Sequence, residues 1–287
     1  MQIRTLAFVA ALSITAMSCT EQGGQQRTEQ EPKFEKTAIK YRIQPVKGVK
    51  PDSIKAMFTE AQLPVVMAVN RVDKTHMLQV DSLVVPDKFE SNLNHYSPFP
   101  YYVAALSDIR KIIFFSYPAQ AFGAYENGKL VRWGPTNMGR EKDQTPTGLF
   151  FTNWKAEETV STVDDEWILK WNFNIANKEG VGWHLYDMPG YPASHSCLRL
   201  LIDDAKYLYD WADEWKLEGN DNIKAYGTPV IVFGSYPFGG QKPWYALANN
   251  ADALDISKET MAQLVNQHKQ EILNKQKQRE ALAANKQ

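Results

Sequence analysis

Two neighbouring motifs, GWHLYD at residues 182–187 and SHSCLRL at residues 194–200, are the most informative part of this chain. They place two histidines, His184 and His195, within thirteen residues of Cys197. A free thiol has a pKa of about 8.5, so a nucleophilic cysteine needs a base or a cation beside it at neutral pH. We expect a strand, a loop and a second strand or turn here, which can bring His184 beside Cys197. A buried structural cysteine is the alternative interpretation.

The surrounding sequence predicts strands more than helices. The run of β-branched and aromatic residues at 111–116 predicts a strand, and residues 121–126 and 129–133 flank Asn127-Gly128, a strong hairpin signal. After a loop over 134–148, further strands are expected at 149–151, 168–173 and 229–233. One main helix is expected at 203–217, capped by Asp203 or Asp204. We therefore expect a mainly β domain rather than a doubly wound α/β domain.

Composition excludes several classes of protein. The 287 residues carry 32 Lys and Arg against 33 Asp and Glu, a net charge of −1, so nucleic acid is not an expected partner. Two cysteines exclude a disulfide framework. The spacing of Cys197, His184 and His195 matches no zinc pattern, and no phosphate-binding, EF-hand or dinucleotide motif is present. We therefore expect no cofactor and no metal.

The N-terminus predicts an envelope location. Residues 1–18 contain one early arginine and an apolar run that is too short to span a bilayer, as in a signal peptide. The end of this segment, followed by Cys19, resembles a bacterial lipoprotein box, which implies acylation of Cys19. Residues 19–45 begin with a polar stretch and are expected to form a tether. We expect a lipid-anchored protein of the cell envelope that faces the periplasm; a plain secreted signal peptide is the alternative.

Two smaller regions flank the predicted β domain. Residues 46–100 contain two short amphipathic stretches and an apolar strand before Pro86, and resemble the second half of a LysM peptidoglycan-binding repeat, with Asn70 after its second helix. A small structural segment is the alternative. Residues 237–287 predict a C-terminal helical extension with a stripe of apolar residues. This helix is expected either to lie across the body or to bind a partner.

Several motifs in the same order resemble the L,D-transpeptidase family, the YkuD-type catalytic domain. That family has a histidine, a variable loop, and then Ser/Thr-His-Gly-Cys, an aliphatic residue and Arg. Further matches are Gln120, the hairpin at 127–129, Thr145-Pro146-Thr147-Gly148 and the closing strand after Gly227. The resemblance covers roughly residues 101–234, and we expect the catalytic domain at 101–236.

The resemblance implies a role for each residue of the two motifs. Cys197 is the nucleophile, and His184 is the base that takes its proton and holds the thiol ionised, with its ring oriented by the Leu185 carbonyl. His195 lines the site and steadies the transition state. Ser194 and Ser196 are also site residues, and the backbone N–H groups of Ser196 and Cys197 form an oxyanion hole. Arg199 either fixes the loop or binds an anionic group of the substrate. Ser196 and Leu185 stand where the family often has glycine, and a positive φ at Ser196 would cost about 1 kcal/mol.

By this resemblance the protein acts on peptidoglycan stem peptides. It would form a cysteine acyl-enzyme, release the terminal D-alanine and make a 3–3 cross-link with the amine of a second stem. Water as the acceptor would make it an L,D-carboxypeptidase, and a lysine of a wall-associated protein would make it an anchoring enzyme. A non-catalytic peptidoglycan-binding lipoprotein is the competing interpretation.

Overall fold

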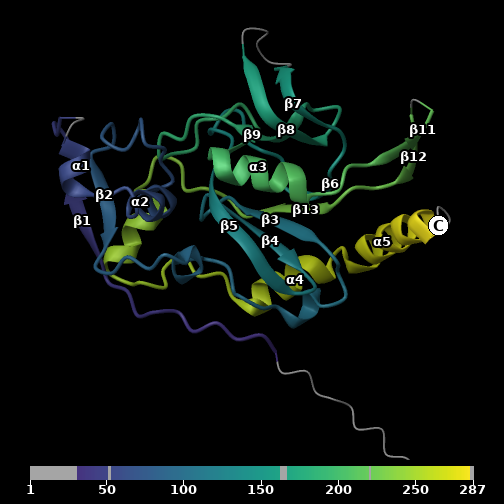
Figure 1. Ribbon diagram of the computed structural model, residues 1–287, viewed down its shortest axis with the longest axis horizontal. Helices are drawn as coiled ribbons and strands as arrows, with labels where there is room; N and C mark the ends of the chain where they lie inside the picture. The colour runs from purple at the N-terminus through teal and green to yellow at the C-terminus, as the bar shows by residue number, and fades with distance from the viewer. Residues whose placement is uncertain (1–30, 51–52, 162–166, 220, 285–287) are drawn as a thin grey trace, which may run out of the picture. The chain divides into compact units, whose positions relative to one another are not determined.

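A mixed sheet of nine strands forms the centre of this computed structural model, in the order β6-β13-β3-β4-β5-β10-β9-β8-β7 (Figure 1). The strands are β3 (Ile112–Ser116), β4 (Ala121–Glu126), β5 (Lys129–Asn137), β6 (Gly148–Phe151), β7 (Lys155–Val160), β8 (Ile168–Ala176), β9 (Val181–Leu185), β10 (Leu198–Leu200) and β13 (Pro229–Phe233). The pairs β3–β13 and β9–β10 are parallel, and the other neighbours are antiparallel. The prediction of a mainly β fold is confirmed.

The structure describes residues 31–50, 53–161, 167–219 and 221–284. The predicted signal peptide, Cys19 and the first part of the predicted tether lie outside these residues, so the lipid anchor stays a prediction. Among the described residues, none of the helices has the length and apolar character needed to cross a membrane.

Two hydrophobic cores cover the two faces of the sheet. All five residues of β3 are buried, and because successive strand residues point to opposite faces, Ile112 and Phe114 enter one core while Ile113 and Phe115 enter the other. The β4–β5 hairpin turns at Asn127 and Gly128 with φ of 46° and 83°, as a tight turn of this kind requires. Strand β5 continues to Asn137, so the loop that the sequence predicted from residue 134 begins later.

Helix α3 (Ile202–Trp211) covers one face of the sheet and is shorter than predicted (Figure 1). The residue before it, Leu201, provides no side-chain cap, so the prediction that an aspartate caps the helix is wrong. The carboxylate of Asp204 instead forms a buried ion pair of 2.7 Å with Arg132 on β5. A Cβ atom at Gly134 would lie 2.2 Å from Oδ2 of Asp204, so only glycine allows this close approach. Residues expected to end the helix form β11 (Lys216–Glu218), which pairs with β12 (Asn222–Ala225).

A small N-terminal region has its own core. It contains β1 (Tyr41–Pro45), α1 (Ile54–Met57), α2 (Leu63–Asn70) and β2 (Ser82–Pro86), and β1 pairs with β2 in antiparallel register. The Asn70 side chain joins α2 to β2, because Nδ2 donates to the Val84 carbonyl at 2.8 Å and Oδ1 accepts from the Val84 N–H at 2.7 Å. Strand β1 begins before residue 46, where the sequence placed the boundary. The likeness to LysM stays a prediction.

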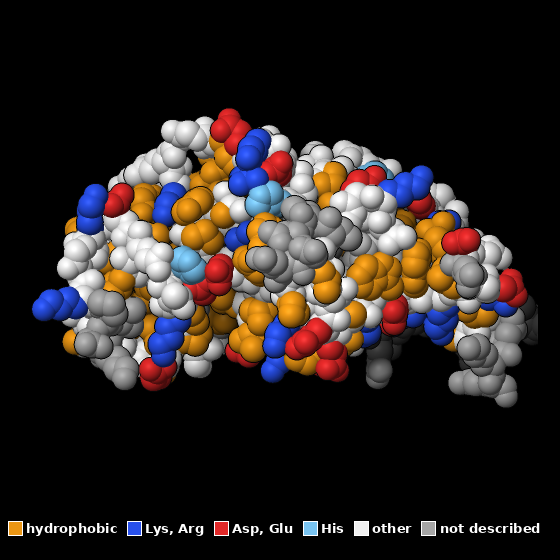
Figure 2. All heavy atoms as spheres, turned by 90° about the horizontal axis from the view of Figure 1, so that it is seen from above, with side chains coloured by type: hydrophobic (Ala, Val, Ile, Leu, Met, Phe, Trp, Pro, Cys, Tyr) orange, Lys and Arg blue, Asp and Glu red, His pale blue; other side chains and the backbone are white. Residues whose placement is uncertain are grey.

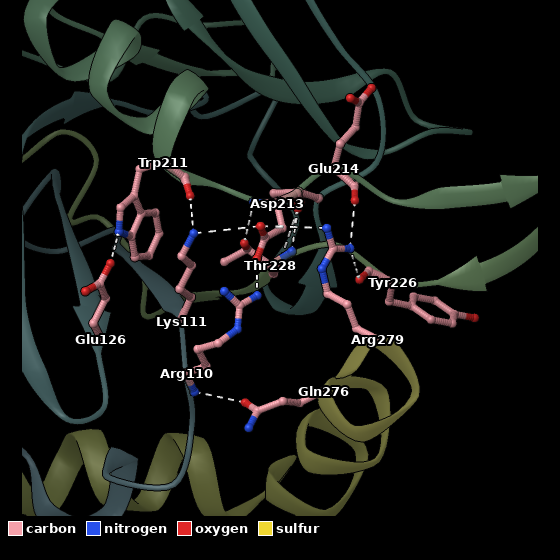
Figure 3. Close-up of polar contacts among 11 residues, drawn as sticks. Arg110, Lys111, Glu126, Trp211, Asp213, Glu214, Tyr226, Thr228, Gln276 and Arg279 are labelled. Carbon is pink, nitrogen blue, oxygen red and sulfur yellow. Dashed lines mark hydrogen bonds and ion pairs between the residues drawn. The ribbon is translucent and has the colours of Figure 1, made fainter. Parts of the chain in front are cut away.

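The C-terminal helices α4 (Lys258–Asn266) and α5 (Lys269–Ala284) lie on the side of the sheet opposite α3 (Figure 1). Their buried residues Met261, Val265 and Ile272 belong to the same core as Phe114. The guanidinium of Arg279 on α5 donates to the carbonyls of Glu214 and Tyr226 at 2.9 and 3.0 Å (Figure 3). Short 3-10 segments complete the chain: η2 (Leu93–Tyr96), η3 (Ala104–Leu106) and η4 (Pro243–Ala248).

A cluster of charges beside α5 fixes this helix to the body. Asp213 pairs with Arg110 and also lies 3.7 Å from both Lys111 and Arg279 (Figure 3). Its own N–H donates to the Thr228 hydroxyl at 2.8 Å. The Asp213 carboxylate therefore joins the residues before β3 to α5, and its backbone N–H joins the residue before β13.

Candidate active site

Cys197 lies immediately before β10, near the middle of the sheet between β5 and β9. Its side chain is partly buried, and its Sγ lies 3.9 Å from the Gly180 carbonyl oxygen. Burial raises the pKa of the thiol, while a hydrogen bond from the Gly182 backbone and the charge of Arg199 partly oppose this rise. Burial therefore favours the protonated form of the thiol.

His184 lies on β9, next to β10 in parallel register. It is almost fully buried, and its Nδ1 lies 3.1 Å from the Leu185 carbonyl oxygen. Because a carbonyl only accepts, Nδ1 carries the proton of the neutral ring and Nε2 is left as an acceptor. Burial lowers the pKa of His184 to about 4, with the Leu185 carbonyl opposing the shift. A neutral imidazole of this kind is ready to accept a proton.

Cys197 and His184 line the same narrow cavity. Its volume is about 20 Å³, near that of one water molecule, and its other lining residues are Ser161, Trp167, Leu169, Tyr186, Ser194, His195 and Arg199. The structure thus brings together both sequence motifs. The expectation that the imidazole holds the thiol ionised is opposed by burial, because desolvation favours the neutral form of both groups.

The loop before the cysteine is held in an uncommon conformation. Ser196 has a φ of 77°, which is the left-handed region where the family's glycine would carry no steric penalty. Its hydroxyl donates to the Asp143 carbonyl at 3.2 Å, and the Ser194 hydroxyl donates to the Cys197 carbonyl at 2.5 Å. Among the described residues, neither Ser196 nor Cys197 uses its backbone N–H in a hydrogen bond. Both donors remain available to an oxyanion.

His195 faces the same cavity and contacts a residue that the sequence did not single out. Its Nε2 accepts from the guanidinium of Arg140, which also holds Asp143 at 2.5 Å. Burial and the Arg140 charge lower the pKa of His195. Its Nδ1 is buried and has no hydrogen-bond partner among the described residues. This arrangement favours a neutral ring whose proton is on Nδ1.

Residues 110–232 match the family model of YkuD, the L,D-transpeptidase catalytic domain. This segment is similar to a YkuD domain. No curated protein sequence gives a significant match to the chain.

Solved structures that resemble the protein include L,D-transpeptidases of three bacteria. That of Stackebrandtia nassauensis is 25% identical with a TM-score of 0.36 over 44% of this chain and 57% of its own. That of Mycobacterium smegmatis is 22% identical with a TM-score of 0.35 over 44% and 59%. A Xylanimonas cellulosilytica L,D-transpeptidase, residues 123–326, is 18% identical with a TM-score of 0.43 over 69% and 100%. The similarity thus spans somewhat more than half the length of the first two.

Arg199 and Leu185 position the site through hydrogen bonds that involve backbone carbonyls. The Arg199 guanidinium donates to the carbonyls of Asp187 and Ala193 at 3.2 and 3.3 Å, and lies 4.5 Å from the centre of the Tyr186 ring. Arg199 therefore fixes the loop between the two motifs, one of the two roles expected for it. Leu185 contributes the carbonyl that orients His184.

Other parts of this segment position the cysteine loop. The Arg140 N–H donates to the Ser194 carbonyl at 3.0 Å, and the Tyr117 hydroxyl donates to the Gly139 carbonyl at 2.7 Å. The Gly139 N–H in turn donates to the Thr145 hydroxyl at 2.9 Å. Thr145 begins the Thr-Pro-Thr-Gly motif, so the sequence pointed to this loop without indicating which side chain would reach His195.

The surface of the molecule carries charges of both signs. Seen from above the view of Figure 1, basic and acidic side chains are interspersed among hydrophobic ones (Figure 2). Among the described residues, one group has the spacing of metal ligands, namely Asp73, His76 and Asp187. The Asp73 carboxylate is already held by the His76 ring at 2.8 Å and by the Met188 N–H at 2.7 Å. We assign no metal to it.

Proposed function

We propose that this YkuD-like domain catalyses L,D-transpeptidation of peptidoglycan stem peptides through a thioester on Cys197. The observation that carries the proposal is the shared cavity of Cys197 and His184, in which the Leu185 carbonyl holds the ring so that Nε2 can accept a proton. General-base assistance of this kind accelerates reactions by about 10²–10⁴-fold.

The first half-reaction forms the acyl-enzyme. The sulfur of Cys197 attacks the carbonyl carbon between the third residue of a tetrapeptide stem and its terminal D-alanine, and the thiol proton passes to Nε2 of His184. The N–H groups of Ser196 and Cys197 stabilise the oxyanion. The C–N bond then breaks, and D-alanine leaves with the proton from His184.

The second half-reaction restores the thiol. The side-chain amine of a second stem attacks the thioester carbon and gives a proton to His184. The C–S bond breaks, and the sulfur recovers that proton. The product is a 3–3 cross-link. Water in place of the amine would give a carboxypeptidase product, and a protein lysine would give an anchored protein.

The test is intact-mass spectrometry of the protein after incubation with a defined tetrapeptide stem. The wild type should gain the mass of the stem without D-alanine, and D-alanine should appear in solution. The Cys197→Ala variant should give neither, while Lys206→Gln, on α3 outside the cavity, should retain both. Release of D-alanine by Cys197→Ala would refute the proposal, and wall binding without acylation of the wild type would favour the binding-protein alternative.

We also propose that the protein is anchored in the cell envelope through acylated Cys19, because the sequence around this residue resembles a lipoprotein box. Two or more acyl chains are needed for stable anchoring, since each buried methylene contributes about 0.8 kcal/mol. Cys19→Ala should move the protein from the membrane fraction to the soluble fraction. Unchanged membrane fractionation would refute acylation.

A further inference from the structure

A second cavity lies on the other side of Arg199. Its volume is about 480 Å³, within the range of ligand sites, and its walls include His76, Asp81, Asp187, Tyr191, Arg199 and Lys242. Arg199 also lines the cavity of Cys197, and Ala193 in the second cavity directly precedes Ser194 in the first. The two cavities are therefore neighbours along one loop.

The N-terminal region contributes one wall of this second cavity and is firmly joined to the loop after His184. The Asp73 N–H donates to the Met188 carbonyl at 2.9 Å, and the Met188 N–H donates to the Asp73 carboxylate at 2.7 Å. Val72 and Pro189 form an isolated bridge. A Cβ atom at Gly190 would lie 2.7 Å from the Val72 side chain, so the two segments are in close contact.

Two opposite charges in this cavity, Lys242 and Asp187, interact with other charges only at longer range, Lys242 with Asp81 and Asp187 with Arg199. The Lys242 ammonium is half-buried, 6.0 Å from the centre of the Tyr191 ring and 5.9 Å from that of Tyr245. Over the described residues, neither Lys242 nor Asp187 forms an ion pair, whereas Asp81 at the rim pairs with Lys47 at 3.2 Å. Tyr191 is 53% exposed and leaves an aromatic surface open to a ligand. A half-buried cation without a counter-ion in direct contact favours binding of an anion.

We propose that this second cavity is the acceptor subsite, and that Lys242 selects an acceptor that carries a carboxylate beside its reacting amine. The Asp187 carboxylate accepts a hydrogen bond from an N–H of the same acceptor. The inference rests on the proposed function, since an acceptor has meaning only where an acyl-enzyme forms. It gives the N-terminal region a role in substrate choice.

The test compares two acceptor stems that differ by one carboxylate: one with diaminopimelate and one with lysine at the third position. The donor is a tetrapeptide stem whose side-chain amine is acetylated, so that it cannot act as an acceptor. The wild type should prefer the diaminopimelate acceptor, and Lys242→Gln should reduce that preference by about tenfold, because it removes the half-buried charge. Lys242→Arg should retain the preference.

A matched control is Lys206→Gln, which removes an ammonium lying 5.2 Å from the centre of the Trp171 ring, outside the cavity. This variant should behave as the wild type. The subsite is refuted if Lys242→Gln forms the acyl-enzyme and keeps the wild-type preference, or if the wild type has no preference. Absence of any acyl-enzyme in the wild type would instead overturn the proposed function and the subsite with it.

Discussion

The two cavities on either side of Arg199 differ in size and in charge. The cavity of Cys197 and His184 holds about 20 Å³, and burial favours the neutral form of both groups. The cavity of Lys242 and Asp187 holds about 480 Å³ and keeps charged side chains within reach of solvent. The first has room for about one water molecule beside the thiol, and the second has room for a charged ligand.

This difference has a mechanistic meaning. In a low-dielectric site, an ion pair of thiolate and imidazolium is costly until another group stabilises it. A neutral pair would therefore transfer its proton when a substrate carbonyl and the two loop N–H groups are in place. In such a mechanism the protein stabilises the transition state more than it stabilises the free enzyme.

The largest expected effect is a loss of acylation rate on replacing a histidine of the small cavity, compared with replacing a histidine of the large cavity. His184→Gln removes the base, and we expect the acylation rate to fall by about 10²–10⁴-fold. The measurement is the time course of acyl-enzyme formation by intact mass. His76→Gln, in the larger cavity, is the matched control and should acylate nearly normally. Equal losses of acylation rate in the two variants would show that acylation does not depend on the small cavity alone.

The pH dependence of the free energy of unfolding reports the desolvation of His184 in the small cavity. The pKa of His184 is lowered from 6.5 to about 4 in the folded state, so between these values the unfolded state binds more protons. The free energy of unfolding should therefore fall as the pH drops from about 6.5 to about 4, by up to about 3 kcal/mol. Denaturant titrations at several pH values measure this. The slope should be shallower in His184→Gln; an unchanged slope would contradict it.

The comparison also identifies elements that the sequence could predict. Strand β13 has the predicted bounds, Pro229–Phe233, and the Asn127-Gly128 hairpin lies where expected, because a buried apolar run and a turn dipeptide are local signals. The spacing of His184 and Cys197 was likewise sufficient to predict that they lie near each other, and both line one cavity. Their burial was not predictable, because it depends on Leu169, which lies on β8, and on Trp167, which directly precedes β8.

Features that depend on distant residues could not be read from the sequence. Arg140 contacts His195 across 55 positions, and Asp204 turns from its helix toward Arg132 across 72 positions. Local propensity treats Asp204 as a cap, but a buried carboxylate beside a guanidinium gains more from the ion pair and its hydrogen bond. Lys242 gave no sequence signal, because its cavity forms only when three separate segments meet.

A third prediction concerns the border of the small cavity. Arg140→Gln removes a cation that contacts the His195 ring and lowers its pKa, so the pKa of His195 should rise. NMR titration of the histidine ring protons measures this shift. Lys142→Gln removes a more distant charge and should raise the pKa less. A pKa of His195 that does not respond to Arg140→Gln would remove Arg140 from this role.

The smallest expected effect tests the loop that joins the two cavities. Ser196→Gly relieves a φ of 77° and should raise the free energy of unfolding by up to about 1 kcal/mol. The lost hydrogen bond from the Ser196 hydroxyl to Asp143 offsets part of this gain. Thermal or denaturant unfolding gives the value. Asn127→Gly, at a φ of 46°, should gain less, because asparagine tolerates this region better. A loss of stability in Ser196→Gly would show that the hydroxyl outweighs the strain.

Strand β13 is the last strand in chain order to join the nine-stranded sheet, yet it lies in its interior, between β3 and β6. A growing chain that has reached Leu200 already contains both motifs but lacks the strand that connects β6 to the rest of the sheet. We therefore expect competence for acyl transfer to arise only after synthesis has passed Phe233. Fragments released earlier by ribosome stalling or proteolysis would be inert toward the cell wall.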